Sequence, residues 1–217
     1  MQKTLLTLAL VAGLTGAANA QRSHSIRSRS QPSTGLSYGI KAGGSMTNFI
    51  SESSIEYENI YGYHAGVFAN VILSNRFSFQ PELLYSQKGA KFPDFVTEGA
   101  TRRLQYLDIP LAFHANFNGF FLEAGPQIGV LLAAQDKVGS TTATVYRKSF
   151  TAADFGFIGG LGYQRASGLG IGVRYNGGLT NISQSGSVGT TLVQGRARNS
   201  AIQLYLSYSI LSGDSRR

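Results

Sequence analysis

Apolar and polar residues alternate along most of this chain with a period of two, and the pattern recurs in eight segments. Alternation at this period is typical of β-strands whose two faces meet different environments. Most of the eight segments are longer than the strands of soluble proteins, which average about five or six residues. Strands of about 9–11 residues, tilted near 45°, cross a lipid bilayer. The predicted strands span residues 36–44, 61–73, 77–88, 103–115, 120–133, 152–164, 169–180 and 200–210.

The connections between these segments alternate in length. Three are short, at residues 74–76, 116–119 and 165–168. The other four are long, polar and rich in Gly, Ser and Thr, at residues 45–60, 89–102, 134–151 and 181–199. Bacterial transmembrane β-barrels have an even number of strands, short periplasmic turns and longer extracellular loops. The pattern therefore predicts an all-β fold, an eight-stranded antiparallel up-and-down transmembrane β-barrel with both chain ends in the periplasm.

The first twenty residues have the organisation of a secretory signal peptide. Lys3 makes the start basic, residues 5–14 are apolar, and Ala18-Asn19-Ala20 is a small-x-small cleavage site. We expect cleavage after Ala20 and export to the cell outer membrane. Export argues against nucleic acid as a partner, despite a formal net charge of +8. The predicted organisation is a signal peptide at 1–20, a disordered basic leader at 21–35, the barrel at 36–210 and a C-terminal tail at 211–217.

One face of every predicted strand is apolar, and the other is rich in glycine and small polar residues. The apolar face suits lipid, because closure of a barrel leaves no unpaired backbone group in hydrocarbon. The small residues suit a crowded interior. A soluble lipocalin-like barrel is the alternative, and it would reverse the two faces. Aromatic residues near the strand ends that adjoin short turns predict a periplasmic girdle: Tyr38, Phe77, Phe113, Phe120, Tyr163 and Tyr208.

Ionisable residues also fall on the predicted lumen face: Lys41, Glu82, Asp108, Glu123, Asp154 and Arg174. Counting from the periplasmic strand ends places all of them except Asp154 at a similar depth. An eight-stranded barrel is only wide enough for side chains to fill it, so these charges must pair. We interpret them as a structural ion-pair plug centred on Arg174, because a guanidinium bridges carboxylates. A narrow pore and a catalytic carboxylate pair are the alternatives.

Several features limit the chemistry open to this chain. It contains no cysteine, which excludes a disulfide framework, a thiolate metal site and a cysteine nucleophile. His64 and His114 point inward by parity, and no histidine-rich motif supports a metal site. A Gly-x-Ser-x-Gly motif is absent. We predict no cofactor, no metal and no enzymatic activity; a lipid-modifying enzyme would need a Ser/His pair at the barrel rim.

Several segments resemble the PorT-like or porin-family outer-membrane β-barrel proteins common in Bacteroidota. The most specific are QPELLYSQKG (residues 80–89) and YLDIP (residues 106–110), and the resemblance covers about residues 36–210. It implies an eight-stranded outer-membrane barrel in which Glu82 and Asp108 are structural. The secretion and gliding role of PorT itself does not carry over, since most members have no assigned role. Such barrels usually end on an aromatic residue read by the assembly machinery, whereas here LSGDSRR follows Ile210.

The predicted function is a structural or interaction role in the outer membrane, with the lumen largely plugged by side chains. A narrow porin-type channel for small solutes is the alternative. Expected partners are outer-membrane lipids and, during insertion, the barrel-assembly machinery. Lipopolysaccharide is a further candidate, because cationic residues occur in the predicted loops: Lys91, Arg102, Lys137, Arg147, Lys148, Arg196 and Arg198.

Overall fold

The structure is a computed structural model, which describes residues 35–51, 57–93, 100–138, 141–145, 151–182, 187–188, 191–192 and 197–209. The predicted signal peptide, the leader up to residue 34 and the C-terminal tail lie outside the described residues. Within the described part of the chain, no helix is long and apolar enough to cross a membrane.

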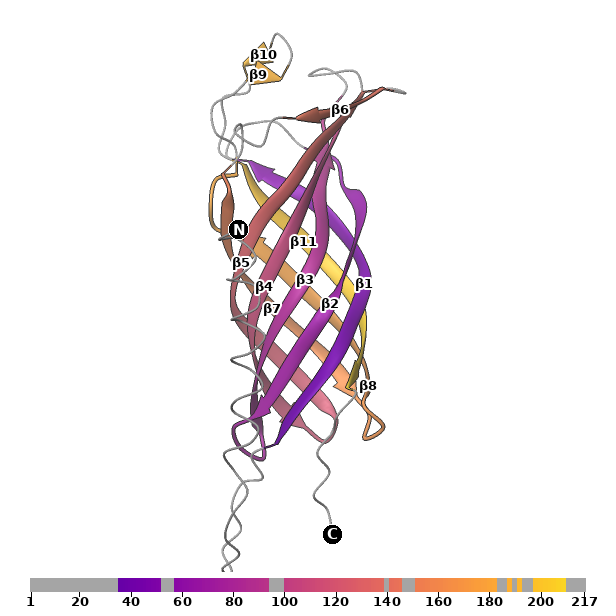
Figure 1. Ribbon diagram of the computed structural model, residues 1–217, viewed down its shortest axis with the longest axis vertical. Coiled ribbons are helices and arrows are strands. Elements are labelled where there is room, and N and C mark those ends of the chain that lie inside the picture. The colour runs from indigo at the N-terminus through magenta and orange to yellow at the C-terminus, as the bar shows by residue number, and fades with distance from the viewer. Residues whose placement is uncertain are drawn as a thin grey trace, which may run out of the picture. The chain divides into compact units, whose positions relative to one another are not determined.

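Eight long antiparallel strands form a closed barrel (Figure 1). Each pairs with the next along the chain, and the last pairs with the first. The predicted fold is therefore confirmed. The barrel strands are β1 (Leu36–Ser51), β2 (Ile60–Ile72), β3 (Phe77–Lys91), β4 (Thr101–Phe117), β5 (Phe120–Val138), β7 (Ala153–Gln164), β8 (Leu169–Gly178) and β11 (Ala197–Ser209). Shorter strands are β6 (Thr141–Val145), which pairs with β5, and β9 (Ser187–Val188) with β10 (Thr191–Leu192).

The short connections all lie at one end of the barrel, which we call the turn end, and the opposite end is the loop end. At the turn end, Asn118 and Gly119 alone join β4 to β5, with φ of 50° and 91°. Positive φ at both central residues is the geometry of a type I′ hairpin turn. A Cβ on Gly119 would lie 2.7 Å from the Tyr163 ring, so glycine also meets a steric requirement there.

Several strands extend further toward the loop end than the alternation predicts. β1 continues to Ser51 and β5 to Val138, and the pairing of Ser51 with Ala197 continues the ladder there. In these extensions the inward positions hold buried apolar residues, such as Phe49 on β1 and Ala134 on β5, in place of the small polar residues of the predicted segments. The alternation of apolar and polar residues therefore stops while the backbone hydrogen bonds continue.

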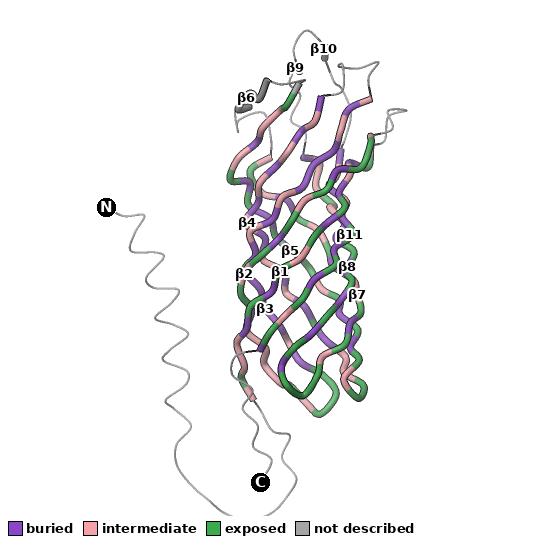
Figure 2. The backbone as a smooth tube through the Cα atoms, turned by 90° about the vertical axis from the view of Figure 1, so that its right-hand side faces the viewer, coloured by how far each residue is buried: buried purple, intermediate pink, exposed green. Residues whose placement is uncertain are grey.

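Exposure alternates along every barrel strand (Figure 2). On β11, Leu204 is 57 % exposed whereas Tyr205 is 2 % exposed. The outward face collects large apolar side chains from all eight barrel strands. An apolar surface this extensive marks contact with a membrane rather than with water. The predicted orientation of the two faces is confirmed, and a lipocalin-like barrel with an apolar interior does not fit it.

Candidate functional site

Four charged side chains meet in the barrel interior, and we call them the lower cluster: Lys41, Glu82, Glu123 and Arg174. Arg174 is 1 % exposed and lies between the two carboxylates. Its Nη1 and Nη2 each donate to Glu82 at 2.8 Å. Its Nε and Nη2 donate to Glu123 at 2.9 and 2.5 Å. Arg174 thus joins β8 to both β3 and β5 through two bidentate pairs.

Lys41 and two neutral side chains complete the hydrogen bonding of the two carboxylates in the lower cluster. Lys41 Nζ donates to Glu82 Oε1 at 2.5 Å and lies 4.1 Å from the centre of the Tyr205 ring. The Tyr205 hydroxyl donates to Glu123 at 2.8 Å, and the Gln80 amide donates to Glu82 at 2.8 Å. Two positive and two negative charges are therefore balanced and hydrogen-bonded, which is the condition for burying them.

The remaining predicted lumen charges, Asp108 and Asp154, lie nearer the loop end together with Lys88. We call these three residues the upper cluster. Lys88 Nζ donates to Asp108 Oδ1 at 3.0 Å, and the Ser86 hydroxyl donates to Asp108 Oδ2 at 2.5 Å. Asp154 accepts a hydrogen bond of 2.8 Å from Asn199, whose amide also donates to the Tyr106 hydroxyl at 3.2 Å. Asp154 has no ion-pair partner among the described residues.

The expectation that Asp108 shares one layer with the lower cluster is wrong. Lys41, Glu82 and Arg174 are each the sixth residue of their strands from the turn end, but Asp108 is the tenth. β4 continues to Phe117, two residues past its predicted end, so Asp108 lies deeper than the count suggests. Its side chain consequently reaches Lys88 instead of Arg174.

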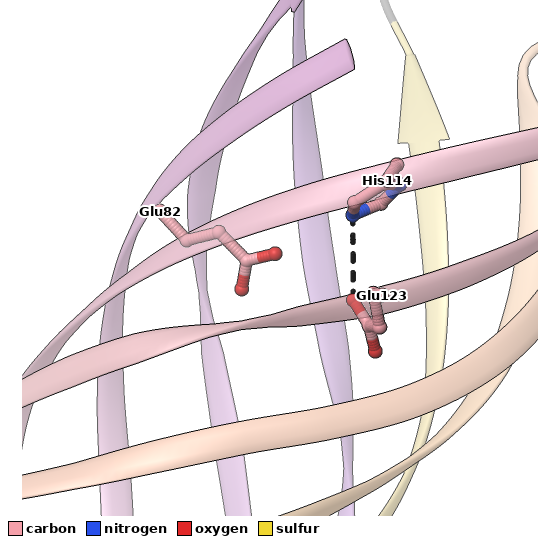
Figure 3. A group of neighbouring side chains, drawn as sticks. All are labelled: Glu82, His114 and Glu123. Carbon is pink, nitrogen blue, oxygen red and sulfur yellow. Dashed lines mark ion pairs between the residues drawn. The ribbon is translucent and has the colours of Figure 1, made fainter. Parts of the chain in front are cut away.

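His114 and His64 both point into the interior. The ligand atoms of Glu82, His114 and Glu123 lie within 4.8 Å of one another (Figure 3), close enough to bind a metal ion. His114 Nε2 is 3.4 Å from Glu123 Oε2. However, Arg174 already serves as counter-ion to both carboxylates, and a metal ion would have to displace it. Neither ring nitrogen of His64 has a hydrogen-bond partner in the described part of the chain.

The chain matches a known protein family over most of its length. Residues 19–184 match the family model described as "Outer membrane protein beta-barrel domain". The chain belongs to this outer-membrane β-barrel family. The family supports location in the outer membrane. Short turns of bacterial barrels face the periplasm and longer loops the exterior, and we expect the same orientation here. Curated proteins provide no match in sequence.

Solved structures of outer-membrane barrels are similar to this chain. Neisserial surface protein A is 15 % identical, with a TM-score of 0.50, over 80 % of this chain and 98 % of that chain. OprG from Pseudomonas aeruginosa is 8 % identical, with a TM-score of 0.48, over 82 % and 98 %. Ail of Yersinia pestis, solved with the heparin analogue sucrose octasulfate, is 10 % identical, with a TM-score of 0.47, over 80 % and 98 %. At 15 % identity the likeness to Neisserial surface protein A shows the fold alone.

The lumen of this outer-membrane barrel differs between its two ends. At the turn end, a polar cavity of about 560 Å³ is lined by amide and hydroxyl side chains, including Asn70, Asn116 and Gln164. Toward the loop end the interior also contains a cluster of buried apolar side chains, on which Tyr57 packs. We call these the apolar layer: Phe49, Ala90, Leu104, Tyr106, Leu131, Ala134, Ile182 and Ala197.

The six residues of the predicted periplasmic girdle lie on the outward face, on strands close to the turn end. Phe120 and Tyr163 pack with ring centres 4.9 Å apart, and Phe113 packs against Phe79 at 5.0 Å. Their contact with the membrane interface stays a prediction.

Proposed function

We propose that this outer-membrane barrel has a closed lumen and acts as a structural or interaction protein through its outer surface and loops. The observation that carries the proposal is the apolar layer. Leu104, Leu131 and Ala134 are completely buried there, and they belong to one apolar cluster with Phe49 and Ile182. Ions and polar solutes lose their hydration in such a layer, so it opposes their passage.

The lower cluster supports the same proposal from within the membrane. Arg174 and Lys41 are bound to carboxylates on other strands, and both are almost completely buried. A conducting lumen needs charged groups that water reaches, as in porins with wide channels. Gln80 lines the polar cavity at the turn end and donates to Glu82 of the lower cluster.

Planar-bilayer recording tests the closed lumen. We expect the refolded barrel to produce no stepwise currents, and Arg174→Ala to be silent as well, because the apolar layer remains in place. Heat-modifiable migration on gels would show that both proteins are folded, and an open porin in the same bilayer would show that the assay detects channels. Reproducible current steps from the wild-type barrel would contradict the proposal and support a narrow channel.

A role without catalysis belongs to the same proposal. Neither described histidine exchanges a hydrogen bond with a serine hydroxyl in the described part of the chain. The carboxylates of Glu82, Glu123 and Asp108 are held by Arg174, Lys41 and Lys88 inside the barrel, away from the rim where lipids would react.

Membership of the PorT-like group of Bacteroidota is also proposed, with support from the sequence segments 80–89 and 106–110. These segments supply Gln80, Glu82, Lys88 and Asp108 to the two clusters. The features most typical of that group therefore coincide with the residues that fill the lumen.

Export through a cleavable signal peptide completes the proposal, and it predicts a specific N-terminus. Protein isolated from outer membranes is expected to begin at Gln21, because Ala18 and Ala20 form the small-x-small cleavage site. Intact mass and N-terminal sequencing measure this directly. Ala20→Arg is the matched variant, and it should leave the precursor uncleaved. A mature protein that still begins at Met1 would contradict the prediction.

A further inference from the structure

The outward face of the barrel is not apolar along its whole length. Near the loop end, β3, β4 and β5 present three cationic residues, which we call the basic patch: Lys91, Arg103 and Lys137. Lys91 and Lys137 both lie opposite Thr101 in the pairing register, and Arg103 is two residues further along β4. The patch therefore spans three adjacent strands. It therefore belongs to the barrel wall and not to a connecting loop.

Arg103 is held in one orientation against the wall. Its Nη1 donates to the Gln87 side chain at 2.7 Å and to the Tyr61 backbone carbonyl at 3.2 Å. Gly89 lies opposite Arg103 in the register and has no side chain, so the arginine crosses β3 to reach β2. Both acceptors are neutral, which leaves the positive charge of the guanidinium available to an anion outside the barrel.

The basic patch lies just beyond a band of tyrosines on the same outward face. The rings of Tyr63 and Tyr85 are 6.0 Å apart, and Tyr61 is 79 % exposed. In the register, Tyr85 lies opposite Leu107 and Gln87 opposite Gln105, so polar residues begin directly beyond the tyrosines. Tyrosine bands mark the boundary between hydrocarbon and headgroups. The patch thus lies at the headgroup level of the outer leaflet.

We propose that the basic patch binds the phosphate groups of a phosphorylated glycolipid of the outer leaflet, the lipid A part of lipopolysaccharide. Arginine binds phosphate through two parallel hydrogen bonds, and Lys137 nearby adds charge attraction. Lys91 contributes less, because its Nζ already pairs with Glu58 at 3.0 Å. The tyrosine band below provides apolar contact for the acyl chains of the same molecule. The acyl chains of one lipid would therefore contact the apolar wall and the tyrosines, and its phosphate groups would contact the basic patch.

The basic patch lies on strands, whereas the sequence predicts that the cationic residues lie in loops. Arg102, counted there as a loop residue, points into the barrel and donates to Asp136 at 2.7 and 2.6 Å. Lys91 and Lys137 belong to strands. Arg147, Lys148 and Arg196 lie outside the described residues. The inference goes beyond the proposed function and does not depend on a closed lumen.

Binding of purified lipid A to the full mature barrel in neutral detergent tests the basic patch, with native mass spectrometry as the readout. Wild type is expected to retain lipid A, and Arg103→Gln with Lys137→Gln to weaken binding by about fivefold for each removed cation. The matched control is Arg76→Gln with Arg165→Gln, which removes the same charge at the turn end. This control should bind lipid A as wild type does.

Two further ligands identify what is recognised. Dephosphorylated lipid A should bind wild type as weakly as lipid A binds the Arg103 and Lys137 double variant. Inorganic phosphate at millimolar concentration should not displace lipid A, since it lacks the acyl chains. Equal binding of lipid A by wild type and the double variant would overturn the proposal, as would an equal loss in the Arg76 and Arg165 control. Displacement by inorganic phosphate would overturn the assignment to a lipid.

Discussion

Replacing Arg174 with leucine is expected to destabilise the folded barrel by about 3–5 kcal/mol, the usual cost of removing one partner from a buried ion pair. Glu82 would keep Lys41 as its partner at 2.5 Å. Glu123 would keep only the Tyr205 hydroxyl and the neighbouring His114. Its buried negative charge would therefore lose its arginine counter-ion. Urea unfolding of the refolded barrel measures the loss as a lower midpoint with an unchanged m-value.

A second substitution separates lost pairing from lost packing. Adding Glu123→Gln to Arg174→Leu removes the unpaired carboxylate, so we expect it to recover much of the stability. Arg165→Leu, in an exposed turn, is the control for arginine loss and should change stability by less than about 0.5 kcal/mol. If Arg174→Leu unfolds at the wild-type urea concentration, the lower cluster does not stabilise the barrel.

The sequence was sufficient to predict which way each strand faces and how the strands are connected. Period-two alternation assigns alternate residues to opposite faces, as Leu204 and Tyr205 illustrate. The lengths of the connections indicated the two ends of the barrel. The alternation and the connection lengths are both local properties of the sequence, so they can be used without knowing which strands pair.

Depth along the barrel was less predictable than the direction of each side chain. Strands of a barrel are tilted and staggered, so residues that are opposite in register do not lie at one height. Lys41, Leu84 and Asp108 lie on one register row through Gly66, yet Lys41 pairs with Glu82 and Asp108 with Lys88. Strand ends beyond the lipid lack alternation, and this added to the error at Asp108.

The neutral partners of the charges were also missed. Tyr205 lies on the glycine-rich face, and its hydroxyl completes the hydrogen bonding of Glu123. Gly172 lies opposite it in the register, where a Cβ would be 2.5 Å from the tyrosine ring. A bulky aromatic residue beside glycines on an inward face was the available signal. The apolar layer gave no such signal, because Phe49 and Ile182 fall in segments predicted to be loops.

Leu204→Arg is expected to destabilise the barrel in a bilayer by about 2–4 kcal/mol, the cost of a cation on the lipid face at the midplane. Leu204 lies on β11 between the outward-facing Ile202 and Leu206, opposite Gly44, whose absent side chain leaves room for the arginine. A steric clash is therefore not the cause of the loss. Reversible urea unfolding in phospholipid vesicles measures the change in the free energy of unfolding.

The same substitution at another height distinguishes lipid from water as the surroundings of this face. Ser200 lies on the outward face of the same strand, four residues nearer the loop end, and Ser200→Arg should cost only about 0–1 kcal/mol at the interface. Leu204→Ala measures the loss of the leucine side chain without an added charge. Leu204 is 57 % exposed, so if this face met water, an arginine would change the stability little at either position. A steep difference between the two arginine variants therefore requires hydrocarbon around Leu204, and equal small effects would contradict a transmembrane barrel.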